Sequence, residues 1–128
     1  MEILKENNYS KYYSIKAIKE YERILKEDFM SLDIDEIKSS GYIVHSLEAS
    51  LWCTLMNDNY EDAVITAVNL GEDTDTIGAI TGSINGIIYG MAAIPERWLE
   101  KLKKKDYLER LTEDFIDTLN HKNKEKSL

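Results

Sequence analysis

Apolar residues recur at intervals of three and four along most of the chain, which is the spacing of one face of an α-helix. No stretch alternates between apolar and polar residues cleanly enough to predict a strand. We therefore predict an all-α fold, a compact bundle of about six helices. The first two predicted helices cover about Ser10–Phe29 and Ser40–Asn57. Asn59 caps the third, which ends at Gly71, and the fourth is rich in glycine. The fifth covers Pro95–Lys104, and the sixth begins near Asp106.

The fourth helix carries glycine at every fourth position, which places the glycines on one face. Each interior glycine costs about 1 kcal/mol of helix propensity relative to alanine, so a series of them needs a compensating interaction. Because a bare face lets a neighbouring helix approach closely, we predict close helix packing along it. The glycines of this series are Gly78, Gly82, Gly86 and Gly90.

Length and composition indicate one globular domain over residues 1–128, with a frayed tail at 121–128. The single cysteine, Cys53, excludes an internal disulfide and fits a reducing compartment. The first nine residues are polar, so no signal peptide is predicted, and we expect a cytoplasmic protein. A formal charge of −8 argues against nucleic acid or an anionic membrane surface as the main partner.

The segment from Gly71 to Thr76, Gly-Glu-Asp-Thr-Asp-Thr, carries the clearest chemical signal of the sequence. It joins the third predicted helix to the glycine-rich one and holds three acidic side chains within four residues. Two interpretations are open from the spacing alone. Asp and Thr are good helix N-caps, and oxygen-rich clusters also suit hard cations such as Mg²⁺ or Mn²⁺.

Three stretches together resemble the C-terminal part of the ADP-ribosylglycohydrolase family, which includes the glycohydrolase that reactivates dinitrogenase reductase. They are SGYIVHSLEASLW from Ser40 to Trp52, AVNLGEDTDTIGAITG from Ala67 to Gly82, and YG followed by IPERW up to Trp98. The resemblance covers about residues 38–105. It implies the C-terminal portion of that family's all-α fold.

The resemblance also implies a function and a site. Family members remove ADP-ribose from modified side chains or related ADP-ribosyl compounds and hold two Mg²⁺ or Mn²⁺ ions. The family's C-terminal metal motif falls on Asp73, Asp75 and Thr76 of this sequence. The implied partners are ADP-ribose or an ADP-ribosylated protein. Two cations beside the ribose could hold its hydroxyls and stabilise charge as the glycosidic bond breaks.

The sequence departs from the family in one important respect. The family's other metal ligands lie in an N-terminal Thr-Asp-Asp motif, and no Thr-Asp-Asp occurs in this chain. We therefore expect weak metal binding, little glycohydrolase activity from this chain alone, and no assignable catalytic residue. The alternative function is an inactive fragment that serves as a nucleotide-binding or protein-interaction module. We expect exposed apolar surface, and as a partner either a second copy or a complementing N-terminal chain.

Other candidate residues have simpler explanations. Asp33 and Asp35 lie in a connector between helices, where Asp commonly serves in turns. His45 and Glu48 are three residues apart on one predicted helix and could face a common metal, but a buried, hydrogen-bonded histidine beside a capping or hydrogen-bonding glutamate is the favoured interpretation. Cys53 lies among apolar residues, as a core thiol would.

Overall fold

The computed structural model describes residues 15–26 and 28–125, and all regular elements within these ranges are helical. Six α-helices, α2 to α7, agree with the prediction of an all-α fold with about six helices. The chain divides into two compact units at Ile94 and Pro95, and each unit is described by itself. None of the described helices combines the length and the apolar character that a membrane span requires.

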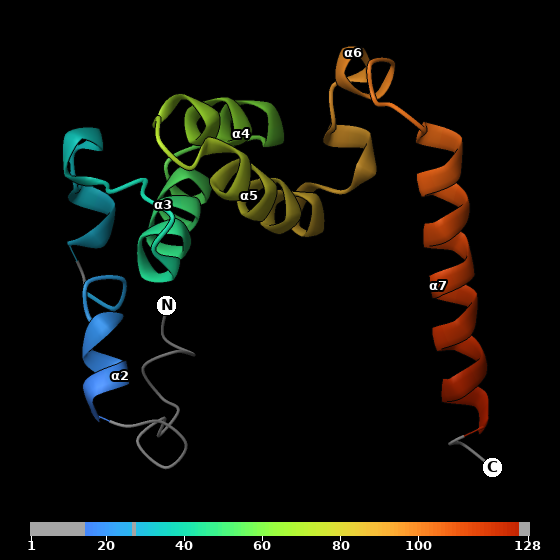
Figure 1. Ribbon diagram of the computed structural model, residues 1–128, viewed down its shortest axis with the longest axis horizontal. Helices are drawn as coiled ribbons and strands as arrows, with labels where there is room; N and C mark the ends of the chain where they lie inside the picture. Colours follow the sequence, from blue (N-terminus) through green and yellow to red (C-terminus); the bar gives the residue numbers. More distant parts are fainter. Residues whose placement is uncertain (1–14, 27, 126–128) are drawn as a thin grey trace. The chain divides into compact units, whose positions relative to one another are not determined.

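The first unit is organised around three helices, α3 (Ile43–Leu55), α4 (Tyr60–Asn69) and α5 (Thr74–Tyr89). Helix α5 packs against both α3 and α4 (Figure 1). Helix α4 begins as predicted, because the Asn59 side chain accepts a hydrogen bond from the backbone N–H of Asp62 at 2.9 Å. The central position predicted for the second helix is confirmed, since α3 also packs against the short helix η2.

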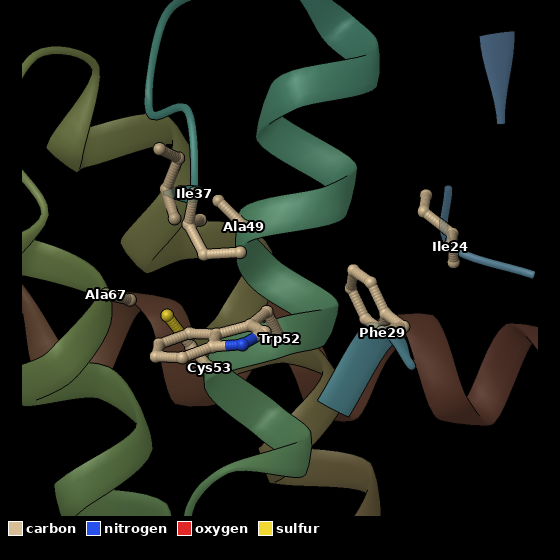
Figure 2. Close-up of a cluster of buried hydrophobic side chains, with 8 residues drawn as sticks. Ile24, Phe29, Ile37, Ala49, Trp52, Cys53 and Ala67 are labelled. Atoms are coloured by element: carbon tan, nitrogen blue, oxygen red, sulfur yellow. The ribbon is translucent and has the colours of Figure 1, made fainter. Parts of the chain in front are cut away.

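The core of the first unit forms between α3, α4 and the segment before α3. Figure 2 shows Trp52 and Cys53 of α3 beside Ala67 of α4, with Phe29 and Ile37 of the preceding segment contributing to the same cluster. The indole N–H of Trp52 donates to the Leu32 carbonyl oxygen at 3.3 Å. The core thereby fixes the segment that leads into α3.

The first predicted helix ends earlier than expected. Helix α2 covers Ile15–Glu20, and residues 21–26 form turns whose backbone hydrogen bonds run from residue i+3 to residue i. Two short 3-10 helices follow, η2 (Phe29–Ser31) and η3 (Ile34–Glu36). Phe29, which belongs to the apolar stripe of the predicted helix, is buried in the core, and the tighter turns also bury Ile24, which lies outside that stripe. Residues 10–14 of that prediction lie outside the described residues.

The glycine face of α5 packs closely for half of its length. A Cβ at Gly78 would lie 2.9 Å from Val68 Cγ1, and one at Gly82 would lie 3.2 Å from the Tyr60 hydroxyl, so both glycines face α4. Gly86 has open space, and Gly90, with φ of 77°, ends the helix rather than continuing the ridge. The predicted close packing is therefore confirmed at two of the four positions. At both positions the contacting atoms belong to side chains of α4.

The second unit contains the short helix α6 (Glu96–Leu99) and the long helix α7 (Lys105–Glu125). Helix α6 is shorter than the predicted Pro95–Lys104 helix, and Pro95 is its N-cap. Helix α7 extends into the segment predicted to fray, and residues 126–128 lie outside the described residues. Several of its apolar side chains are exposed. They are Tyr107, Leu108, Leu111, Phe115, Ile116 and Leu119.

Candidate functional site

The acidic loop lies between the end of α4 and the start of α5. It reverses direction at Gly71 and Glu72, which have φ of 90° and 51°. Glycine adopts this left-handed region without penalty, whereas Glu72 does so at a cost. Gly71 thus follows the helix end at the position predicted from the sequence, and the turn brings Asp73 to the N-cap position of α5.

The structure brings two of the three predicted metal ligands into contact. The Thr76 hydroxyl donates a hydrogen bond to Asp73 Oδ1 at 2.9 Å. Asp73 is half-buried, whereas Asp75 and Thr76 are exposed on the first turn of α5. All three therefore gather at one helix N-terminus, where the partial positive charge of the helix favours carboxylates.

Asp73 occupies the N-cap position without acting as a side-chain cap. Its carboxylate makes no capping hydrogen bond to the first turn of α5. Asn59 and Asp33, which occupy equivalent positions, both accept such bonds, from Asp62 N–H and Asp35 N–H respectively. Of the capping alternative that the sequence left open for this loop, the structure therefore keeps the N-cap position of Asp73 and lacks the side-chain hydrogen bond. Its oxygen atoms are directed instead toward Thr76 and toward Gly41, where a Cβ would lie 3.3 Å from Asp73 Oδ2.

The donors of the loop are two carboxylates and a hydroxyl, which are the hard oxygen ligands that Mg²⁺ and Mn²⁺ prefer. Across the described residues, no three His, Cys, Asp or Glu side chains are arranged so that they could hold a metal ion. The loop therefore offers part of a coordination sphere, and the metal site at Asp73, Asp75 and Thr76 stays a prediction.

An open cavity of about 620 Å³ lies beside the loop. The loop contributes Glu72 to its lining, and the segment before α3 contributes Lys38, Ser39 and Ser40. His45 of α3 also lines it, and the Ser40 hydroxyl lies 2.7 Å from His45 Nδ1. Sequence reasoning missed this group, because its members come from the loop, from α3 and from the segment before α3, which only the packed helices bring together.

His45 and Glu48 do not face a common ligand. His45 contacts Ser40, and its ring packs edge-on against Tyr42 with the ring centroids 5.1 Å apart. Glu48 is buried and forms an ion pair with Arg23, whose Nη1 lies 3.1 Å from Glu48 Oε1. Arg23 also donates from Nη2 to the Glu36 carbonyl oxygen at 2.9 Å. Each residue of the pair thus has its own structural partner, but His45 is half-buried rather than buried, and Arg23 is a partner that the sequence did not reveal.

Two further candidates are structural. Asp33 forms a capping box with Glu36 at the start of η3, which confirms the turn interpretation of the Asp33–Asp35 pair. Cys53 is fully buried, and burial raises the pKa of its thiol to about 11. A thiol with so little thiolate at neutral pH is a poor nucleophile, so Cys53 is a core residue.

Fold and site together define an all-α protein with an oxygen-rich acidic loop at the N-terminus of a long, glycine-faced helix. A sequence profile described as ADP-ribosylglycohydrolase matches residues 2–125. The chain belongs to the ADP-ribosylglycohydrolase family.

Curated relatives match a shorter region. ADP-ribosylarginine hydrolase Tri1 of Serratia proteamaculans is 46% identical over 82 residues, covering 64% of this chain and 22% of the relative. ADP-ribosyl-[dinitrogen reductase] glycohydrolase of Rhodospirillum rubrum is 38% identical over 82 residues, covering 64% of this chain and 27% of the relative. ADP-ribosylhydrolase ARH3 of Mus musculus is 27% identical over 94 residues, covering 63% of this chain and 25% of the relative. The chain thus spans about a quarter of the length of these relatives.

Proposed function

We propose that this chain is part of an enzyme that hydrolyses the glycosidic bond between ADP-ribose and a protein side chain. In this proposal Asp73, Asp75 and Thr76 contribute ligands to a site for Mg²⁺ or Mn²⁺. The observation that carries the proposal is the carboxylate of Asp73, which stands at a helix N-cap without capping the helix. The relative named as an ADP-ribosylarginine hydrolase supports arginine as the modified residue, and the relative named as an ADP-ribosyl-[dinitrogen reductase] glycohydrolase supports a modified protein as the substrate.

The chain's own residues prepare the site in a definite way. Asp73 and Asp75 supply negative charge at the N-terminus of α5, and Thr76 holds one oxygen of Asp73 in place. Bound divalent cations would supply charge stabilisation at the ribose, and they would reverse the negative potential that otherwise repels an anionic diphosphate. The packing of α5 against both α3 and α4 would hold these ligands in fixed positions relative to one another.

A second candidate function follows from how little of a coordination sphere the described residues carry. The chain covers about a quarter of the length of its relatives. Its described part holds no group of three His, Cys, Asp or Glu side chains that could bind a metal ion. Such a chain could bind ADP-ribose without turnover. It would then act in the cytoplasm as a nucleotide-binding or interaction module. It would work alone, as a homo-oligomer, or with a complementing N-terminal chain.

Metal binding and turnover are tested in two successive experiments. Mn²⁺ is titrated into the chain and into the variants Asp73→Asn and Asp75→Asn, with Asp33→Asn as the matched control from the other Asp-x-Asp pair. We expect weak binding that both loop variants abolish and that the control retains, because Asn at position 33 can still cap η3. Equal binding by all four proteins would refute the metal site.

The second step adds an ADP-ribosylated arginine peptide, and separately free ADP-ribose, with and without Mn²⁺. Release of ADP-ribose supports the hydrolase. Heat of binding to ADP-ribose without release supports the module. If the chain neither binds nor releases ADP-ribose, including after addition of an N-terminal family segment bearing Thr-Asp-Asp, both functions are wrong.

A further inference from the structure

Two segments that are distant in the sequence meet at the acidic loop. The backbone N–H of Asp73 donates to the Ser39 carbonyl oxygen at 3.1 Å. The hydroxyl of Ser39, a residue that is only 6% exposed, donates to the Leu70 carbonyl oxygen at 3.3 Å. One residue of the segment before α3 therefore binds the backbone at both ends of the turn that carries Glu72.

The next contact between these segments involves Gly41 and the carboxylate itself. A Cβ at position 41 would lie 3.3 Å from Asp73 Oδ2 and 3.8 Å from Asp73 Cγ. Gly41 is not among the glycines with positive φ, which within the described residues are Gly71 and Gly90. An L-residue could adopt its backbone conformation, so space beside the carboxylate explains the absence of a side chain.

Neither partner of this contact is loosely held. The Ser40 carbonyl oxygen accepts a hydrogen bond from the buried Ser46 hydroxyl at 3.3 Å, and the Ser40 hydroxyl contacts His45 Nδ1. On the other side, Thr76 holds Asp73 Oδ1 at 2.9 Å. A methyl group at position 41 would crowd Asp73 Oδ2. Rotation of the Asp73 carboxylate would relieve this crowding most easily, and that rotation breaks the contact with Thr76.

We propose that Gly41 is a positioning residue for Asp73: its missing side chain leaves the space in which Oδ2 is held, and Ser39 fixes the backbone on which this orientation depends. This inference rests on the proposed function, because the orientation matters only if Asp73 binds a cation. Gly41 touches neither substrate nor metal in this scheme and acts through Asp73.

The test compares Gly41→Ala with Gly82→Ala, a glycine with similar crowding at 3.2 Å but against Tyr60 of α4. Free Mn²⁺ is measured by electron paramagnetic resonance during titration, and metal-free stability by thermal unfolding. Gly41 is exposed, so the added methyl group does not enter the core. We expect about a tenfold or greater loss of Mn²⁺ affinity in Gly41→Ala, the scale of supporting-residue changes at metal sites. We expect unchanged metal-free stability in this variant and unchanged affinity in Gly82→Ala.

A second measurement does not depend on metal binding. In the metal-free protein, the amide NMR resonances of Asp73 and Thr76 should shift in Gly41→Ala and stay in place in Gly82→Ala. Unmoved resonances, or Mn²⁺ affinity equal to that of the unmodified chain, would overturn the role of Gly41. An unmodified chain that binds no Mn²⁺ while these resonances do shift would refute the proposed metal site and leave the steric coupling established.

Discussion

Ile77 connects the acidic loop to the core, so replacing it tests how the site is supported. Its side chain is fully buried on the first turns of α5. Its backbone N–H donates to the Asp73 carbonyl oxygen at 3.1 Å, and its own carbonyl oxygen accepts from the buried Ser50 hydroxyl at 3.3 Å. Shortening the side chain removes packing at the point where loop, α3 and α5 meet.

The expected cost of Ile77→Ala follows from the burial of its side chain. Truncating a buried isoleucine to alanine costs about 2–5 kcal/mol, because apolar burial is lost and a cavity remains. Alanine is the better helix former, which returns a few tenths of a kcal/mol. We expect a loss of about 3 kcal/mol, a large share of the roughly 5–15 kcal/mol that stabilises a domain.

Urea unfolding gives this free energy, with Trp52 fluorescence as the probe of the first unit. A Trp98→Phe background makes Trp52 the only tryptophan. The matched control is Ile87→Ala, the same substitution on the same helix at a side chain that is 87% exposed. The control should change the free energy by no more than about 0.5 kcal/mol. Equal losses in the two variants, or a loss under about 1 kcal/mol for Ile77→Ala, would refute the packing argument.

Four further predictions address other parts of the first unit. Asn59→Ala should destabilise the protein by about 1 kcal/mol in urea unfolding, because α4 loses its cap, whereas Asn59→Ser, which keeps a capping oxygen and adds no charge beside Asp62, should cost less. Arg23→Met should cost about 2 kcal/mol by leaving the Glu48 carboxylate buried without its ion pair, and the double variant with Glu48→Met should recover part of that loss. Cys53 should react with iodoacetamide at pH 8 at least about a hundredfold more slowly in the folded than in the urea-unfolded chain, since its side chain is closed to the reagent and burial raises the pKa of its thiol from 9.0 to about 11. The same shift should lower the free energy of unfolding as pH rises from about 9 to 11, because the unfolded thiol loses its proton first.

The sequence predicted features that depend on local chemistry. Asn59 could be identified as a cap because its partner Asp62 is three residues away, and Gly71 could be identified as a helix end because left-handed backbone favours glycine. The break after Glu20 was missed, since the same apolar stripe fits a continuous helix and a series of tighter turns. The Arg23–Glu48 pair was also missed, because it depends on how the segment before η2 packs against α3.

At the candidate site, too, the sequence predicted the local chemistry but not the contacts between distant segments. The residue types at Asp73, Asp75 and Thr76 suggested hard cations, but capping remained equally open until the carboxylate of Asp73 was located. Its orientation depends on Gly41 and Ser39, which lie more than thirty residues earlier in the chain. Spacing within the loop therefore predicted its chemistry, and only the packing of α3 against α5 defined its geometry.

This geometry indicates why metal affinity should be weak in this chain. The loop backbone is tied to Ser39, one oxygen of Asp73 to Thr76, and α5 to both neighbouring helices, all through residues of the first unit. Two of the proposed ligands, Asp73 and Thr76, are thus held in place without a cation. Weak affinity would then arise from the number of ligands, because Mg²⁺ requires near-octahedral oxygen coordination and three side chains leave the remaining positions to water. Added carboxylates from a complementing polypeptide should therefore raise affinity without reorganising the loop, and the Asp73 amide resonance should keep its metal-free position when that polypeptide binds without metal.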